Sequence, residues 1–155
     1  MTVLKNVNFS NAITTVIMQP MHANAQGSVH GGNLMMLMDN VAGIAAIKHA
    51  KSSVVTARVD ELVFLKPVNV GDIITCVGQL AYVGRTSMQV IVKIYVRDVN
   101  DYDKPELALT SFFTMVHLVN GKPAPVEKLI PITDEEKELY RLGESKYLEI
   151  KEKYK

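Results

Sequence analysis

Asp39 is the residue whose type and surroundings most clearly suggest chemistry, because it interrupts the apolar run LMMLMDNVAGIAA. Burying a carboxylate without a partner is costly, so such a run keeps one only for a reason. One reason is a general base in an active site. The other is a narrow polar strip, formed by Asp39 and Asn40, at a subunit contact or a solvent edge. From the residues alone, both interpretations stay open.

The motif His30-Gly31-Gly32 precedes this run. A helix that begins here would offer unpaired backbone N–H groups and the positive end of its dipole, which together suit an oxyanion. Two glycines also let a ligand approach the backbone closely, although such pairs are common before helices. Asn24 lies in the same loop, where it could orient a water molecule or donate to a carbonyl group. It is also an ordinary turn residue.

Metal and nucleophilic-serine chemistry are weakly supported. His22 and His30 lie near one aspartate, but their spacing matches no known ligand motif and no cysteine or second carboxylate is close in sequence. Ser28 and Ser87 lack the G-x-S-x-G surroundings of a nucleophile elbow. Hydrolysis by a carboxylate-activated water is the simplest prediction, and it needs no metal or other cofactor.

A second constellation could bind an anion. Gly84-Arg85-Thr86-Ser87 combines a cation, two hydroxyl groups and backbone N–H groups at the start of a predicted strand. These groups could cradle a phosphate, and they would equally make a good turn. Arg58 and Lys66 are further cationic candidates, with a solvated surface charge as the ordinary alternative.

The elements that must position these residues are an early strand, a long helix and four later strands. Residues 12–18 are β-branched and stop at Gln19-Pro20, which predicts a strand. Residues 33–49 lack period-two alternation and are rich in Leu, Met and Ala, which predicts a helix, apolar nearly all round and therefore buried. Four strand-length segments follow, joined by short turns that imply antiparallel neighbours: SVVTARVDELVFLKPV, DIITCVGQLAYV, TSMQVIVKIYVRDV and ELALTSFFTMVHLV.

The C-terminal segment predicts a charged surface helix that begins after Thr133, with Glu136 completing a capping box. The element order predicts an α+β fold in which one antiparallel β-sheet wraps around the long central helix. We expect a single domain over residues 1–155, with its core at about 12–120 and a helical tail at about 133–155. One helix covers one sheet face poorly, so two copies should pair.

Composition narrows the class of protein. The chain has 155 residues, of which 48% are hydrophobic and 21% charged, as is typical of a globular domain. A net charge of +1 gives no general attraction to nucleic acid or to an anionic membrane. The lone Cys76 cannot pair within the chain and is expected to be a packing residue in a reducing compartment. Without a signal-like segment or an apolar run of about 18 residues, the cytoplasm is the expected location.

Three blocks together resemble the cytosolic acyl-CoA hydrolase branch of the hotdog thioesterases: MQPMHANAQGSVHGGNLMMLMDNVAGIAA, VVTARVDELVFLKPVNVGD and VGRTSMQVIVKIYV. They occur in the family's order between Ile13 and Val119. The resemblance implies the hotdog fold and the hydrolysis of fatty-acyl-CoA to free coenzyme A and a carboxylic acid. His22 departs from the pattern, because relatives often have an acidic residue there, and the loop geometry or pH dependence could differ accordingly.

The resemblance also implies roles for individual residues. Asp39 corresponds to the catalytic aspartate, and Asn24 to the loop asparagine that acts across a subunit interface. The backbone of Gly31 and Gly32 corresponds to the segment that polarises the thioester carbonyl. The remaining positions are implied contacts of the acyl-CoA substrate: His30, Thr56, Arg85, Thr86 and Ser87. Two domains are expected to pair through one continuous sheet with shared active sites, and such dimers to form a hexamer as a trimer of dimers.

Two other functions fit parts of the sequence. A hydratase or dehydratase on the same fold would need an acid/base pair, which His30 and Asp39 could mimic. A non-catalytic acyl-CoA sensor would need an output domain, and neither a DNA-binding helix pair nor a basic charge balance supports one. Whether Asp39 acts as base or nucleophile stays open. The preferred acyl length stays open too, because periodicity does not say which residues of the helix face the cavity.

Overall fold

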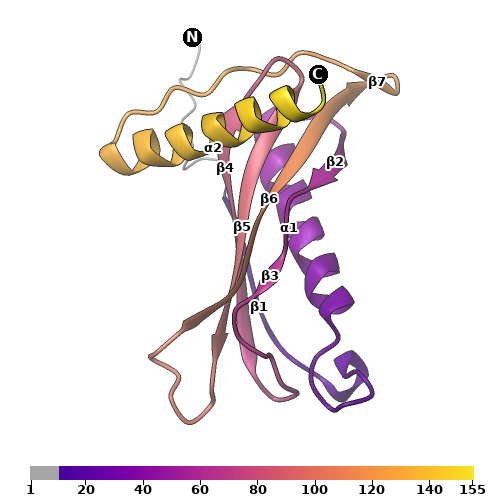
Figure 1. Cartoon of the computed structure of the whole chain (residues 1–155), viewed down its shortest axis with the longest axis vertical. Helices are drawn as coiled ribbons and strands as arrows, with labels where there is room; N and C mark the ends of the chain where they lie inside the picture. Colours follow the sequence, from indigo (N-terminus) through magenta and orange to yellow (C-terminus); the bar gives the residue numbers. More distant parts are fainter. Residues whose placement is uncertain (1–10) are drawn as a thin grey trace.

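The computed structural model describes residues 11–155 of the chain. In this part of the chain an antiparallel sheet has the order β1-β4-β5-β6-β2, with β3 and β7 paired to β6. One long helix, α1, lies on one face of this curved sheet and a second, α2, lies across the other (Figure 1). The strands are β1 Asn11–Ile17, β2 Val54–Val59, β3 Val63–Phe64, β4 Ile73–Val83, β5 Ser87–Arg97, β6 Glu106–Val119 and β7 Lys122–Pro123.

Helix α1 spans Gly31–Ala50 and begins two residues before the predicted start. The reason is His30, whose Nδ1 accepts a hydrogen bond from the Gly32 N–H at 2.9 Å and so caps the first turn. Lys51 ends the helix in the left-handed conformation, with φ of 59°.

The expectation that α1 is buried all round is wrong for the single chain. One side of the helix packs on the sheet, and the opposite side exposes a row of large apolar side chains. This exposed row consists of Met35, Met36, Ile44 and Ile47. The helix is apolar on nearly all sides, as predicted, but a single sheet can cover only one side of a straight helix.

The approach of α1 to β4 is close because Gly78 has no side chain. A Cβ atom added at Gly78 would lie 2.8 Å from Cγ1 of Val41, closer than such atoms pack. The helix therefore packs closely on the middle of the sheet, and the core residues of α1 and of the central strands lie between them.

The predicted alternation in β5 is confirmed. Met88, Val90, Val92 and Ile94 are fully buried beneath α1. Gln89, on the opposite face, is also buried, and its Oε1 accepts a hydrogen bond from Thr114 Oγ1 at 3.1 Å. The strands β4, β5 and β6 form a meander of antiparallel neighbours, as the short turns between them predict.

The segment predicted as one strand, residues 53–68, is instead split into β2 and β3. In addition, β2 carries a β-bulge between Thr56 and Arg58. Ala57 is the extra residue: Thr56 pairs with Met115 and Arg58 with Thr114, the next residue along β6. A regular strand would point Thr56 and Arg58 to the same face. Because of the bulge, Thr56 and Val59 face α1, whereas Arg58 points to the other side, toward Asp60 and α2.

Helix α2 spans Asp134–Lys153 on the outer face of the sheet. Thr133 caps it as predicted, accepting from the Glu136 N–H at 3.1 Å. The predicted capping box is wrong in one detail: the Glu136 carboxylate accepts from the N–H of Ile132 rather than of Thr133. Gly143 lets the helix lie directly on β4, since a Cβ there would be 2.8 Å from that of Ala81.

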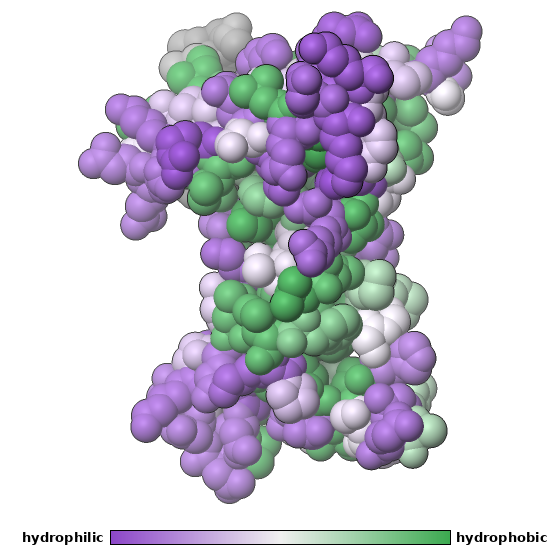
Figure 2. Space-filling view, in the orientation of Figure 1, coloured by the Kyte–Doolittle hydropathy of each residue, from purple (hydrophilic) through white to green (hydrophobic). Residues whose placement is uncertain are grey.

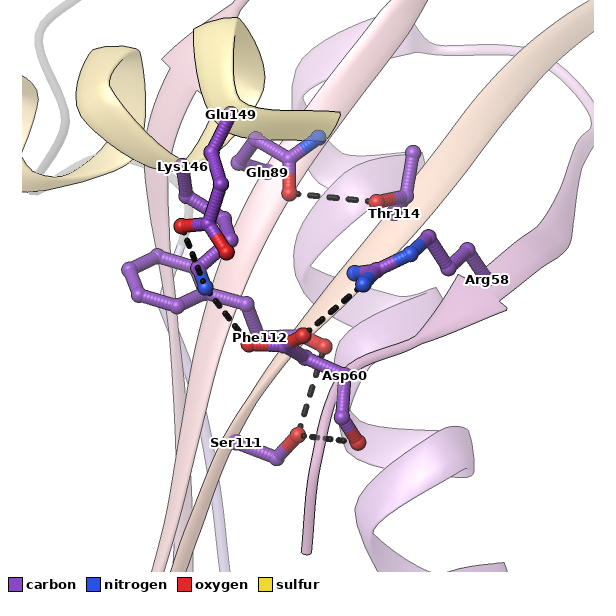
Figure 3. A network of polar contacts seen from close by, with 8 residues as sticks. All are labelled: Arg58, Asp60, Gln89, Ser111, Phe112, Thr114, Lys146 and Glu149. Atoms are coloured by element: carbon purple, nitrogen blue, oxygen red, sulfur yellow. Dashed lines mark hydrogen bonds and ion pairs between the residues drawn. The ribbon is translucent and has the colours of Figure 1, made fainter. Parts of the chain in front are cut away.

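A polar network ties α2 to the end of β2 (Figure 3). The Asp60 carboxylate binds Arg58 at 2.9 Å and Lys146 of α2 at 2.8 Å, and Lys146 also binds Glu149 at 3.0 Å. The Asp60 backbone carbonyl accepts from the Ser111 hydroxyl. Burial raises the pKa of Asp60, but the hydrogen bonds from Lys146 and Arg58 outweigh it, so the pKa lies below its ordinary value.

Candidate active site

Asp39 is half-buried on α1 and faces β2, where Thr56 meets it. The Thr56 hydroxyl donates to Asp39 Oδ1 over 2.6 Å, the length of a strong charge-assisted hydrogen bond. The sulfur of Met115, 3.6 Å away, is a much weaker acceptor for the same hydroxyl. Within residues 11–155 Asp39 Oδ2 has no hydrogen-bond partner, so one carboxylate oxygen is fixed and the other is open to a ligand.

Two apolar grooves meet at this carboxylate. We call the first the Val59 groove; it has a volume of about 340 Å³ and is lined by Met35, Met36, Asp39, Thr56, Val59 and Phe113. The second, the Gly43 groove, has a volume of about 460 Å³ and is lined by Asp39, Asn40, Gly43, Ile44, Ile47, Val54, Thr56 and Met115. A linear substrate whose reactive centre lies at Asp39 could therefore extend in both directions.

The helix start supplies a candidate oxyanion site with one free donor. The Gly32 N–H is occupied by His30, whereas the Gly31 N–H has no acceptor within the described part of the chain. A Cβ at Gly31 would lie 3.0 Å from the ring of Phe64, so a larger residue there would have to displace this exposed ring. His30 is exposed and acts as the helix cap.

Asn24 forms a compact turn rather than a contact with Asp39 of its own chain. Its Oδ1 accepts from the N–H groups of Gln26 at 2.9 Å and Ser28 at 3.2 Å, and its Nδ2 lies 3.2 Å from the Ser28 hydroxyl. Asn24 is not among the residues that line the two grooves. His22, the departure from the family pattern, accepts from the Gln19 N–H through Nδ1 at 2.9 Å.

Arg85, Thr86 and Ser87 lie in and after the β4–β5 turn. The carbonyl of Thr86 accepts from the N–H of His117, which in turn pairs with Val54 of β2. Because Val54 lines the Gly43 groove, the turn and that groove lie toward the same end of the sheet. Arg85 is exposed and has no ion pair with any residue between 11 and 155.

Sequence reasoning named Thr56 as a substrate contact but missed its hydrogen bond to Asp39. The alternation of β2 could place Thr56 on one face, yet the bulge and the position of α1 decide what it meets. The groove residues Val59, Phe113 and Met115 were also missed, because nothing in their types separates a groove wall from a core.

Two other features bear on chemistry. Cys76 is fully buried, and burial raises the pKa of its thiol to about 12, so the packing role expected for it fits. Among residues 11–155 no three His, Cys, Asp or Glu side chains gather as metal ligands do. No helix in that range is long and apolar enough to cross a membrane.

This fold and site belong to a known family. Residues 26–101 match the family model described as the thioesterase superfamily. The structure also superposes on an apo-hexameric acyl-CoA thioesterase with a TM-score of 0.89 and 34% sequence identity, over 97% of this chain and 96% of that one. The chain therefore belongs to the thioesterase superfamily, and the predicted hotdog fold is confirmed.

Within this superfamily the chain is similar to acyl-CoA hydrolases. The rat cytosolic acyl coenzyme A thioester hydrolase is 37% identical over 149 residues, which are 95% of this chain but 39% of that protein. The chain thus spans well under half the length of this relative. An acyl-CoA hydrolase from Staphylococcus aureus, solved with butyryl coenzyme A and coenzyme A, is 36% identical with a TM-score of 0.83, over 98% of this chain and 96% of that one.

Proposed function

We propose that the protein hydrolyses acyl-CoA thioesters with Asp39 as the catalytic carboxylate. The observation that carries the proposal is the Asp39–Thr56 hydrogen bond at the junction of two apolar grooves. The relatives named above are acyl-CoA thioester hydrolases, and their similarity supports the same substrate class here. We infer that the whole chain is one thioesterase domain.

The chemistry needs only groups that the site offers. Thr56 holds one oxygen of Asp39, so the other can accept a proton from a water molecule as that water attacks the thioester carbonyl carbon. The carbonyl oxygen becomes an oxyanion, which the Gly31 N–H at the helix N-terminus can stabilise, with the Gly32 N–H as a second donor if His30 releases it. Collapse of the intermediate breaks the carbon–sulfur bond, and coenzyme A leaves as a thiol after taking up the proton.

Variants of the Staphylococcus aureus hydrolase support this choice of residues. That enzyme has been solved with an asparagine, an aspartate and a threonine separately replaced by alanine. The three replaced positions are separated along that chain by the same intervals as Asn24, Asp39 and Thr56 are here. We infer that the same three side chains form the active site of this protein.

Asn24 would reach the reaction from a second copy of the chain. Its side chain does not line the grooves of its own chain, so the site is completed by Asn24 of the partner subunit. Edge strand β2 and the exposed apolar row of α1 are the surfaces that such a pairing would cover. We infer a homodimer with shared active sites and no cofactor beyond the coenzyme A of the substrate.

A hexamer built from three such dimers is also part of the proposal. The solved thioesterases similar to this chain include hexameric ones. A second uncovered surface suits further assembly: Figure 2 shows a hydrophobic band across the waist of the face that carries α2. Ile13 and Ile17 on β1 and Val63 on β3 are exposed apolar residues on strands that α2 does not cover. Because the mammalian relatives are named cytosolic, we propose a cytoplasmic location.

The test is release of free thiol from a panel of acyl-CoA esters of increasing chain length. Replacing Asp39 by Ala should lower kcat/KM about a hundredfold or more, since it removes the proton acceptor. Asn24→Ala should lower it as well, and Asp103→Asn, on an exposed turn, serves as the matched control. An enzyme that binds acyl-CoA but releases no thiol would overturn the proposal, and hydration of an enoyl-CoA, followed by absorbance, would then favour the hydratase.

A further inference from the structure

We propose that the two grooves divide the substrate: the acyl chain lies in the Val59 groove, the pantetheine arm lies in the Gly43 groove, and Val59 limits the acyl length. This inference rests on the proposed function, because it takes an acyl-CoA as the ligand. It assigns an orientation to the substrate and a specificity role to a residue of β2. Three observations support the orientation.

The first observation is the chemistry of the groove walls. Beyond Asp39 and Thr56, the Val59 groove is lined only by hydrocarbon and thioether side chains: Met35, Met36, Val59 and Phe113. An acyl chain needs no hydrogen-bond partner, and methionine adapts its shape to a flexible chain. The Gly43 groove adds the amide of Asn40, which can hydrogen-bond to one of the two amide groups of a pantetheine arm.

The second observation is where each groove leads. The Gly43 groove runs along Val54, and Val54 pairs with His117, whose N–H donates to the carbonyl of Thr86. Arg85 is therefore about two strand spacings, or about 10 Å, across the sheet from the end of this groove. The Val59 groove leads the other way, along β6 from Phe113 toward Glu106.

The third observation is the charge at the two ends. Lys48 and Lys51 lie at the C-terminal end of α1, toward which the Gly43 groove runs, and Lys48 Nζ donates to the carbonyl of Asn11. His49 Nε2 lies 2.6 Å from the carbonyl oxygen of Glu127, and the neighbouring Val126 N–H donates to the carbonyl of Arg85, so this end of the helix lies beside the Arg85 turn. The opposite end of the sheet carries an acidic turn between β5 and β6, which contains Asp98, Asp101 and Asp103, together with Lys104. The phosphates of coenzyme A are attracted to the first end and repelled by the second.

The β2 bulge explains why Val59 is the residue that limits the chain. The bulge returns Val59 to the face of Thr56, so its side chain forms the wall just beyond the reacting carboxylate. Val59 pairs with Phe113, which is buried and cannot move aside easily. A larger residue at position 59 shortens the groove without touching Asp39 or the Gly43 groove.

The test compares filling one groove with filling the other. Val59→Phe should lower the ratio of kcat/KM for long over short acyl-CoA at least tenfold, Val59→Leu should do so less, and Val59→Ala should raise it. Gly43→Val should raise KM for all chain lengths alike and leave the ratio near that of the wild type. Gly43→Ala is the folding control, because its Cβ would only reach ordinary contact, 4.0 Å, with Met115.

Binding of non-hydrolysable acyl-CoA thioethers, measured by calorimetry, separates this inference from the proposed function. If the wild type releases no thiol, the catalytic proposal fails, but the effect of Val59→Phe on long-chain binding still decides the orientation. A length profile that shifts in Gly43→Val and not in Val59→Phe would reverse the orientation and overturn the inference. A profile that neither variant shifts would place the acyl chain elsewhere and overturn it too.

Discussion

At the scale of single residues, the hydrogen bond between Thr56 and Asp39 fixes the orientation of the Asp39 carboxylate. It occupies Oδ1, while Oδ2 has no hydrogen-bond partner among residues 11–155 and the Asp39 side chain lines both grooves. A carboxylate free to rotate would spend part of its time with neither oxygen aligned for proton transfer, so the hydroxyl group would preorganise the base that we propose. Thr56 is in this sense a positioning residue, in addition to any contact that it makes with substrate.

Replacing Thr56 by Val should therefore lower kcat about tenfold, because a hydrogen bond to a charged group contributes about 1.5–3 kcal/mol. Valine keeps the shape of threonine and removes the donor. Thr56→Ser should restore most of the rate, which a purely steric role for the methyl group would not predict. The measurement is kcat and KM for both variants on one acyl-CoA, with melting temperature as the check on folding. Full activity in Thr56→Val would refute the role.

Cys76 should be inert toward thiol reagents in the folded protein. Burial raises its pKa to about 12, so almost no thiolate exists at neutral pH, and no reagent can reach the sulfur. A chromogenic disulfide should label one thiol per chain in denaturant and none in buffer. Labelling of the native protein would show that the core opens readily. If the prediction holds, thiol-release assays report coenzyme A alone.

At the scale of elements, the Asp60 network connects α2 to the end of β2, a few residues from Thr56. The lowered pKa of Asp60 makes this link pH-dependent. A carboxyl group with a lowered folded pKa adds stability that is present above its ordinary value of 3.8 and is lost as the pH falls through the folded value. The link is therefore intact at neutral pH and fails only in acid.

Replacing Lys146 by Met should lower the free energy of unfolding by about 1 kcal/mol at pH 7, because Asp60 keeps Arg58 as a partner. The difference from wild type should shrink as Asp60 becomes protonated below about pH 4. Lys137→Met, on an exposed face of the same helix, is the matched control. Denaturant unfolding at pH 7 and pH 3 measures the free energy of unfolding of each variant and of the wild type. A difference between Lys146→Met and wild type that is the same at both pH values would contradict the account.

The elements that the sequence predicted well are those with their own local signal. The β5 alternation of Met88, Val90 and Val92 and the Thr133 cap of α2 needed no knowledge of distant residues. The split of β2 and β3 falls at Asp60, whose partner Lys146 is far away in sequence, so no local pattern could show that contact. Asp39 was recognisable because a carboxylate stands out in an apolar run, whereas its partner Thr56 became visible only when α1 lay on the sheet. Asn24 stays a prediction.

At the scale of the whole molecule, the single chain leaves uncovered the surfaces next to its proposed active site. The edge of β2 and the exposed row of α1 both border the grooves at Asp39. An active site of this kind would be complete only in the assembled protein, so activity and assembly should be lost together.

Val55→Lys tests this link. Val55 is 45% exposed on the edge strand, and a lysine there would oppose pairing of two such edges by charge repulsion. We expect a smaller particle by light scattering and a loss of thiol release at the same protein concentrations. Val119→Lys makes the same change at a similarly exposed residue, 47%, at the C-terminal end of β6, where the strand pairs with β7. A fully active monomer of Val55→Lys would contradict the shared site.

The bulge at Ala57 has a consequence for how this segment can change in length during evolution. One extra residue in β2 sets which side chains of the strand point inward. Thr56 pairs with Met115 and Arg58 with Thr114, so deleting the single codon for Ala57 would restore a regular ladder and leave Thr56 and Val59 on the inner face. A regular strand that kept Ala57 would instead bring the cation of Arg58 under Asp39 and send Val59 outward. Lineages that keep the chemistry can thus lose the bulge residue, but they cannot keep it and straighten the strand.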